Sequence, residues 1–256
     1  FSDGSKFIHD GFVAGSLRGM DSSGIFQLDR QFKPFMTKAA KSGPQFIKET
    51  DVKAFLTDAA RSPLTVCHVR AATVGSVKAD NAHPFCVSDE TGKRLIGVHN
   101  GTLYNWERKE GAKDINVDSH WAMKNISTNG IDAFKDFQGA YCFAWWDEHN
   151  PSKFQMIRNS QRPMHFMLSK DKKKMIFGSE AMMVAWIAER NRILVEPEVY
   201  ALEEGKLYTF ALDAKEISFT KGADDLSRFS SAYNTTQNRS GHYSNMDAWN
   251  DYEETY

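Results

Sequence analysis

Cysteine is scarce in this sequence: there are only three, and they lie far apart. An odd number at wide spacing excludes a disulfide framework and predicts a reducing compartment, so we expect a cytoplasmic protein. No apolar run reaches membrane-spanning length and no signal peptide is visible, which argues against a membrane partner. The net charge of -1 shows no excess of basic residues of the kind that binds phosphate groups, so nucleic acid is not an expected partner.

The length of 256 residues is enough to bury one full core. The composition changes near residue 222, after which Ser, Asn, Thr and acidic residues dominate, with aromatic residues spaced among them. Such a composition is typical of a disordered segment. We therefore predict a folded domain over residues 1–221 and a polar tail over 222–256. We expect the aromatic residues of the tail to dock on a partner or a second subunit, giving a homo-oligomer or a larger assembly.

Polar groups in the first half of the chain stand at the ends of apolar runs. Residues 64–69 alternate and include β-branched side chains, which predicts a strand that delivers Arg70 to its exit. A guanidinium there can hold a carboxylate through two hydrogen bonds. Residues 95–99 predict a second strand that breaks at Asn100-Gly101. A side-chain amide and a backbone N–H at that corner can point at one oxygen, as an oxyanion hole requires.

Each of these residues also has an ordinary structural interpretation. Asn-Gly after an apolar run most often marks a hairpin turn, Arg70 alone a surface ion pair, and His83 alone a loop histidine. Cys67 and His68 are adjacent on the predicted strand, so their side chains point to opposite faces and cannot form a nucleophile–base pair. A functional site is favoured only by the order of these residues along the chain and by their occurrence together in one stretch.

Ligand-type side chains are frequent in this stretch, yet their spacing does not favour a metal. No pair has the close spacing of zinc motifs, and His83-x-x-Cys86 is a single weak match. We interpret Cys67 and Cys142 as small buried apolar side chains, and we expect neither a metal nor a cofactor.

Local patterns predict the remaining elements. Apolar spacing favours helices over residues 5–17 and 51–60. Asp118 is a natural N-cap for a helix that runs to about residue 126, and Ser179 for one that runs through Arg190. Alternating residues predict further antiparallel strands at 24–28, 33–36, 139–146, 153–158, 164–168, 175–177, 206–210 and 216–220.

Several segments in combination resemble one known family. HVRAATVGS, NAHPF and GVHNGTLYN are similar to the glutamine-binding half of class II glutamine amidotransferases, which are N-terminal-nucleophile hydrolases. LRGMDSSG, GAYCFAWWD and FGSE resemble further segments of that family, so the resemblance covers about residues 1–220. It implies an α+β fold in which two stacked antiparallel sheets lie between helical layers, a four-layer αββα sandwich.

The resemblance also implies a role for each matching residue. Asn100 and the Gly101 N–H would be catalytic and hold the oxyanion, while Arg70 would hold the α-carboxylate of glutamine. The implied substrate-binding residues are Arg70, Thr73, His83 and Asp118, the last of which would bind the α-ammonium. Arg18 and Asp21 would support the nucleophile strand.

The nucleophile of this family is an N-terminal cysteine, whereas the sequence begins at Phe1. Arg18 lies nearer to Phe1 than the matching arginine of the family lies to its nucleophile, so we expect that cysteine a few residues before Phe1. Ala71 and His120 stand where the family commonly has an aromatic residue and a glutamate. These departures leave open a γ-glutamyl substrate other than glutamine.

The expected function is therefore the release of ammonia from glutamine by a standalone amidotransferase domain. Any ammonia acceptor would then lie on a separate protein. The alternative from another class is a catalytically inactive domain that serves as a structural or assembly component.

Overall fold

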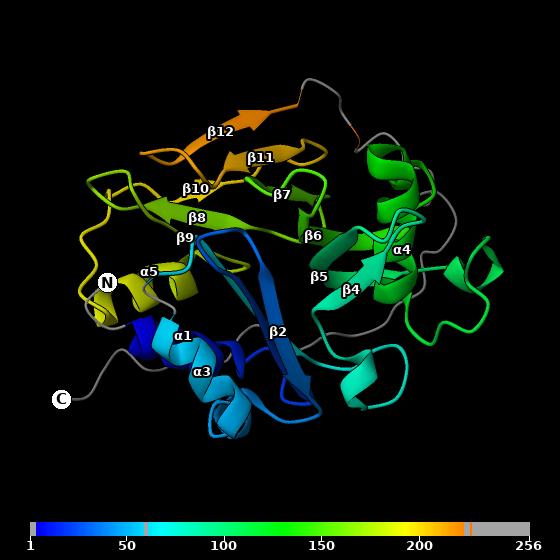
Figure 1. The fold of residues 1–256 in the computed structure, drawn as a ribbon, viewed down its shortest axis with the longest axis horizontal. Coiled ribbons are helices and arrows are strands. Elements are labelled where there is room, and N and C mark those ends of the chain that lie inside the picture. Colours follow the sequence, from blue (N-terminus) through cyan, green and yellow to red (C-terminus); the bar gives the residue numbers. More distant parts are fainter. Residues whose placement is uncertain (1–3, 59–60, 223–225, 227–256) are drawn as a thin grey trace, which may run out of the picture.

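The computed structural model describes residues 4–58, 61–222 and 226, and Figure 1 shows their arrangement. Helices form where apolar residues recur every three to four positions, as Ile8 and Phe12 do in the first of them. The helices are α1 (Gly4–Gly15), α2 (Gly43–Phe46), α3 (Thr50–Asp58), α4 (Asp118–Asn129) and α5 (Ala181–Arg190), with short 3-10 turns η1 (Ala79–Asn81), η2 (Trp106–Arg108) and η3 (Gly130–Lys135). None of the described helices is both long and apolar enough to cross a bilayer.

Two small antiparallel sheets make up one layer of the structure. The first has the order β2-β1-β3 and the second β10-β8-β9. Their strands are β1 (Ser22–Leu28), β2 (Pro34–Ala39), β3 (Leu64–Arg70), β8 (His165–Leu168), β9 (Met175–Gly178) and β10 (Tyr200–Ala201). β3 and β9 are therefore outer strands of their sheets.

A larger antiparallel sheet makes up the next layer, in the order β12-β11-β7-β6-β5-β4. Its strands are β4 (Phe85–Ser88), β5 (Arg94–Leu103), β6 (Gly139–Asp147), β7 (Lys153–Arg158), β11 (Tyr208–Ala211) and β12 (Ser218–Lys221). β5 and β6 form its centre, and their long pairing runs from Leu95↔Asp147 to Leu103↔Gly139.

Buried apolar clusters hold these layers together. One cluster joins Phe26 and Val66 of the first small sheet, Phe166 of the second, and Val98 and Trp146 of the large sheet. Both small sheets therefore pack on the same face of the large one. Helix α4 packs on the opposite face of the large sheet, α1 to α3 cover the first small sheet, and α5 covers the second. This helix–sheet–sheet–helix order confirms the predicted four-layer αββα sandwich.

Strand β5 does not end at Asn100-Gly101, so both the predicted break and the hairpin-turn interpretation are wrong. The strand stays paired with β6 through Gly101↔Tyr141 and on to Leu103. Gly101 has φ +147°, and a Cβ there would lie 1.9 Å from the Ala140 carbonyl oxygen. Only glycine allows this distortion while the strand continues, because any side chain would collide with β6.

Two predicted N-caps are also wrong. Helix α4 begins at Asp118 itself with Val117 as its N-cap, because the Asp118 carboxylate accepts a hydrogen bond from the Leu103 N–H of β5 at 2.8 Å. Helix α5 begins at Ala181 with Glu180 as N-cap, one residue later than the Ser179 cap that we predicted. The predicted docking of the 222–256 tail lies outside the described residues, apart from residues 222 and 226.

Candidate functional site

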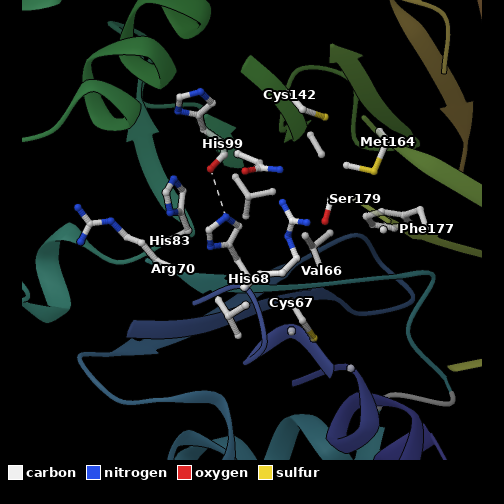
Figure 2. Close-up of a pocket in the computed structure, with 18 of the residues that line it drawn as sticks. Val66, Cys67, His68, Arg70, His83, His99, Cys142, Met164, Phe177 and Ser179 are labelled. Carbon is white, nitrogen blue, oxygen red and sulfur yellow. Dashed lines mark hydrogen bonds between the residues drawn. The ribbon is translucent and has the colours of Figure 1, made fainter. Parts of the chain in front are cut away.

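A pocket of about 350 Å³ lies where the two small sheets face the large one, a size within the usual range for small-molecule sites. Figure 2 shows Val66 and His68 of β3, Cys142 of β6, Met164, and Phe177 of β9 around it. Seven of the eight residues singled out from the sequence line this pocket: Arg18, Arg70, Thr73, His83, Asn100, Gly101 and Asp118. Asp21 does not.

Arg70 ends β3 at the pocket and is 8% exposed. One of its terminal nitrogens, Nη2, donates to the Val74 carbonyl oxygen, whereas Nη1 has no hydrogen-bond partner within the described part of the chain. Burial lowers the pKa of the guanidinium, and the nearby Asp118 and Asp21 oppose that effect. A buried donor without a partner is costly, so this side chain is prepared to receive a carboxylate.

Asp118 is buried at the first turn of α4 and is anchored on β5. Its Oδ2 accepts from the Leu103 N–H at 2.8 Å, whereas Oδ1 has only a weak contact of 3.4 Å with the Ser119 hydroxyl. His99 lies 4.0 Å away, but burial lowers the pKa of its imidazole, so the contact is not an ion pair at neutral pH. Oδ1 therefore keeps acceptor capacity for an ammonium group.

The side chains of β5 alternate between the two faces of the large sheet. Val98 faces the small sheets and Leu103 faces α4, so Asn100, at an even position, points toward the pocket. On the opposite face, His99 stacks on Phe143 with ring centroids 4.3 Å apart and contacts the Ser119 hydroxyl through Nδ1 at 2.9 Å. Asn100 is thus presented to the pocket by a strand that is firmly packed from behind.

His83 and His68 lie against each other at the wall of the pocket, with ring centroids 4.1 Å apart. His68 Nε2 lies 3.2 Å from the His99 carbonyl oxygen and donates to it (Figure 2). Neither ring nitrogen of His83 has a hydrogen-bond partner in the described residues. Burial lowers the pKa of His68 to about 3 and that of His83 well below its usual value. Both rings are therefore uncharged at neutral pH, so His83 would meet a ligand as a neutral group.

The two residues with predicted supporting roles make different contacts. Asp21 Oδ2 accepts from the Ala72 N–H at 2.7 Å, and its own N–H donates to the Arg70 carbonyl at 3.0 Å. It therefore fixes the backbone that follows β3 without reaching the pocket. Arg18 forms an ion pair with Glu180 and joins the segment after α1 to the start of α5.

The thiols are poor nucleophiles in this environment. Burial raises the pKa of both Cys67 and Cys142 to about 12. Cys67 packs among the apolar residues under α1 while His68 turns toward His99, which agrees with their predicted opposite orientation. Among the described residues there is no group of three or more His, Cys, Asp or Glu side chains that could hold a metal.

Sequence reasoning missed several polar residues of the pocket, among them Thr102 and Arg162. The Thr102 hydroxyl lies 3.2 Å from that of Thr73. The sequence did place Thr102 two residues after Asn100, a spacing that puts both side chains on one face of a strand. Because we predicted that the strand breaks at Gly101, this relation was not recognised. Arg162 lies in the loop after β7. A loop has no periodic pattern from which the direction of a side chain can be predicted.

Solved structures with a similar fold include two amidotransferase-type or biosynthetic enzymes. A glutamine phosphoribosylpyrophosphate amidotransferase from B. subtilis matches with a TM-score of 0.64 and 16% identity, over 86% of this chain and 47% of its own. A structure described as the allosteric regulatory enzyme of purine biosynthesis matches with a TM-score of 0.64 and 18% identity, over 85% of this chain and 46% of its own. This chain thus shares the fold of these two structures.

Sequence comparisons find similarity to glutamine amidotransferases over part of the chain. A family model described as a glutamine amidotransferase domain matches residues 68–186 of this chain. Glutamine–fructose-6-phosphate aminotransferase of Buchnera aphidicola is 28% identical over 173 residues, covering 60% of this chain and 27% of its own. The Streptococcus pneumoniae R6 enzyme of the same name is 30% identical over 159 residues, covering 56% and 25%. The chain thus spans about a quarter of the length of these relatives.

Proposed function

We propose that this protein hydrolyses the side-chain amide of glutamine and releases ammonia. The observation that carries the proposal is the convergence, on one pocket, of the Arg70 guanidinium with its unpaired Nη1, the anchored Asp118 carboxylate and the Asn100-Gly101 pair of β5. Opposite charges fixed at two points select a free α-amino acid, because a ligand that lacks either charge leaves a buried group unpaired. Thr73 and His83 complete the proposed substrate contacts.

We further propose that the nucleophile is a cysteine thiol on a segment that precedes Phe1. β3 and β9 both line the pocket, and each is an edge strand of its small sheet. Among the described residues, no strand pairs with the outer edge of β3 or of β9. Free edges of this kind accept an additional strand through main-chain hydrogen bonds. Helix α1 also lines the pocket, so a segment that leads into α1 can lie along these edges. Its first residue would then come close to Asn100.

The proposed reaction has two steps. The thiol attacks the amide carbon, and the Asn100 side-chain amide and the Gly101 N–H donate to the oxyanion that forms. The C–N bond breaks, and ammonia leaves with a proton that the α-amino group of the nucleophile took from the thiol. Water then attacks the thioester, which releases glutamate and restores the thiol.

The direct test is an assay of the full-length protein with L-glutamine. We expect ammonia and glutamate in equal amounts, and loss of both when the cysteine before Phe1 is replaced by alanine. An intact protein that releases neither product would overturn the proposal and favour the inactive assembly component. Ala71 lines the pocket where the resembling family commonly has an aromatic residue, so γ-glutamyl anilides are the matched alternative substrates. Faster turnover of these than of glutamine would assign the other γ-glutamyl specificity.

The wider setting is also a proposal. We infer that ammonia passes to a separate acceptor domain or protein. The free thiols Cys67, Cys86 and Cys142 accord with a cytoplasmic location. A homo-oligomer or a larger assembly that is joined through the aromatic tail completes the proposal, and sedimentation of the full-length protein with and without residues 227–256 tests it.

Replacing Arg70 with glutamine is expected to raise KM for L-glutamine by about ten- to a hundredfold, because a charge-assisted hydrogen bond of roughly 1.5–3 kcal/mol is lost. Glutamine keeps a donor for the Val74 carbonyl, so the loop should remain in place. Steady-state kinetics measure the effect, and Arg192→Gln, in the turn after α5, is the matched control because it lies outside the pocket lining. Equal KM values for Arg70→Gln and the wild type would remove Arg70 from the site.

A further inference from the structure

Thr102 is a polar residue of the pocket to which the proposed chemistry has so far given no role. It follows Gly101 on β5 and pairs with Ala140 of β6. Side chains at even positions of β5 face the small sheets, as Ile96 and Val98 show by their membership of the core between the sheets. The Thr102 side chain therefore stands on the same face as Asn100, and both line the pocket.

The spacing of these two side chains suits one small ligand. Residues two apart on a strand are separated by roughly 7 Å. In an extended glutamine the amide carbon and the carboxylate carbon are four bonds, or roughly 5 Å, apart. With its amide oxygen at Asn100, glutamine thus brings its α-carbon end to Thr102 when it lies along β5.

The surroundings of Thr102 are those that an α-amino acid end requires. Asp118 is anchored on the N–H of Leu103, the next residue, so an acceptor for the α-ammonium lies alongside. The Thr102 hydroxyl also lies 3.2 Å from that of Thr73, which belongs to the loop that begins after Arg70. One proton is shared between these two hydroxyls, and the other proton remains available to a ligand.

We infer that Thr102 is a specificity-determining residue, and that the Thr73–Thr102 hydroxyl pair donates its free proton to the α-carboxylate that Arg70 also binds. This inference rests on the proposed hydrolysis of glutamine and deepens it. Three elements then bind the amino-acid end of the substrate: the end of β3 through Arg70, the first turn of α4 through Asp118, and β5 through Thr102. β5, which contacts the reacting amide through Asn100, thereby also contacts the α-carboxylate of the substrate through Thr102.

The test replaces Thr102 with valine, which keeps the shape and the β-branching but removes the hydroxyl. KM for L-glutamine is expected to rise about tenfold or more, the effect of losing one hydrogen bond to a charged group, while kcat stays within about twofold. Thr102→Ser should restore KM. Thr128→Val is the matched control, because the Thr128 hydroxyl bonds the Lys124 carbonyl on the exposed side of α4 and lies outside the pocket lining.

Two substrate analogues separate recognition from a structural effect. Glutaramate keeps the carboxylate and lacks the α-ammonium, whereas 4-aminobutanamide keeps the ammonium and lacks the carboxylate. We expect Thr102→Val to weaken binding of glutaramate about as much as that of glutamine, and to leave 4-aminobutanamide unaffected. A loss that is equal for all three ligands would overturn carboxylate recognition and indicate a structural role.

Calorimetric titration with L-glutamine keeps this inference distinct from the proposed function. If the wild type binds glutamine without hydrolysing it, the proposed function fails while the difference between wild type and Thr102→Val still decides the role of Thr102. If the wild type hydrolyses glutamine and Thr102→Val has the same KM and the same Kd, the inference fails and the function stands. A wild type that neither binds nor hydrolyses glutamine would overturn both.

Discussion

Replacing Asn100 with alanine is expected to lower kcat for glutamine hydrolysis by about a hundredfold or more, with little change in KM. In the proposed reaction the side-chain amide donates to the oxyanion, which exists only after attack, and removing one such donor costs on the order of 3–4 kcal/mol. Folding should be retained, because the backbone of β5 pairs with Cys142 of β6 whatever side chain position 100 carries. Steady-state kinetics and urea unfolding measure the two effects.

The control for this substitution is Asn129→Ala, at the exposed end of α4, which should leave both constants unchanged. If the Asn100→Ala variant kept its kcat within about twofold of the wild type, Asn100 would have no part in the oxyanion hole. A rise in KM alone would instead indicate that Asn100 contacts the substrate equally before and during the reaction.

Mild acid is expected to destabilise the folded protein strongly, through the buried His83 and His99 and the half-buried His68. Burial lowers the pKa of His68 to about 3, and lowers the pKa of His83 and His99. The folded state therefore keeps these rings neutral, while the unfolded chain protonates them below about pH 6.5. Each ring then reduces the free energy of unfolding by up to about 1.4 kcal/mol per pH unit as the pH falls. The loss continues toward the folded-state pKa, and it is absent above about pH 7.

The carboxylates change the free energy of unfolding at a lower pH than the histidines do. Burial tends to raise the pKa of Asp10, but hydrogen bonds from Lys6, Arg190 and Asn191 outweigh it and lower the pKa to about 2. The stability that Asp10 contributes is therefore lost only as the pH falls below its unfolded value of 3.8. Between pH 6.5 and about 4.5, the buried histidines dominate the slope.

Urea unfolding at intervals from pH 7 to pH 4.5 measures this slope, and His83→Phe tests its origin. Phenylalanine fills the ring volume and does not titrate, so the slope should decrease by up to about 1.4 kcal/mol per pH unit. His149→Gln is the contrasting variant. A hydrogen bond with Asp89 raises the pKa of His149, so its contribution is lost as the pH rises, and its removal should not flatten the acid slope. A His83→Phe slope equal to that of the wild type would show that His83 is not the source.

How far the sequence anticipated the structure depended on whether a feature is local. The strand over residues 153–158 was predicted with its observed limits, because alternation is a property of the segment itself. The course of β5 was not, because Asn-Gly is locally a turn signal and only the pairing of Gly101 with Tyr141 carries the strand onward. The Asp118 cap failed for the same reason, since a hydrogen bond to β5 replaced the local one.

The candidate site shows a similar division. The order of short motifs was enough to indicate Arg70 and Asn100, which the fold brings to one pocket from two different sheets. Thr102 and Arg162 went unnoticed, because one depended on the continuation of a strand and the other lies in a loop. No sequence pattern indicated that both nitrogens of His83 would lack partners, since burial depends on the packing of distant elements.

The raised pKa values of Cys67 and Cys142 have a practical consequence for counting reactive thiols. Thiols with a pKa of about 12 are almost wholly protonated at neutral pH and should resist alkylation by iodoacetamide. Of the cysteines in the described chain, only the exposed Cys86 would compete for the reagent. In a Cys86→Ser background, the stoichiometry of rapid alkylation of the native protein would therefore report directly on a thiol carried by residues before Phe1.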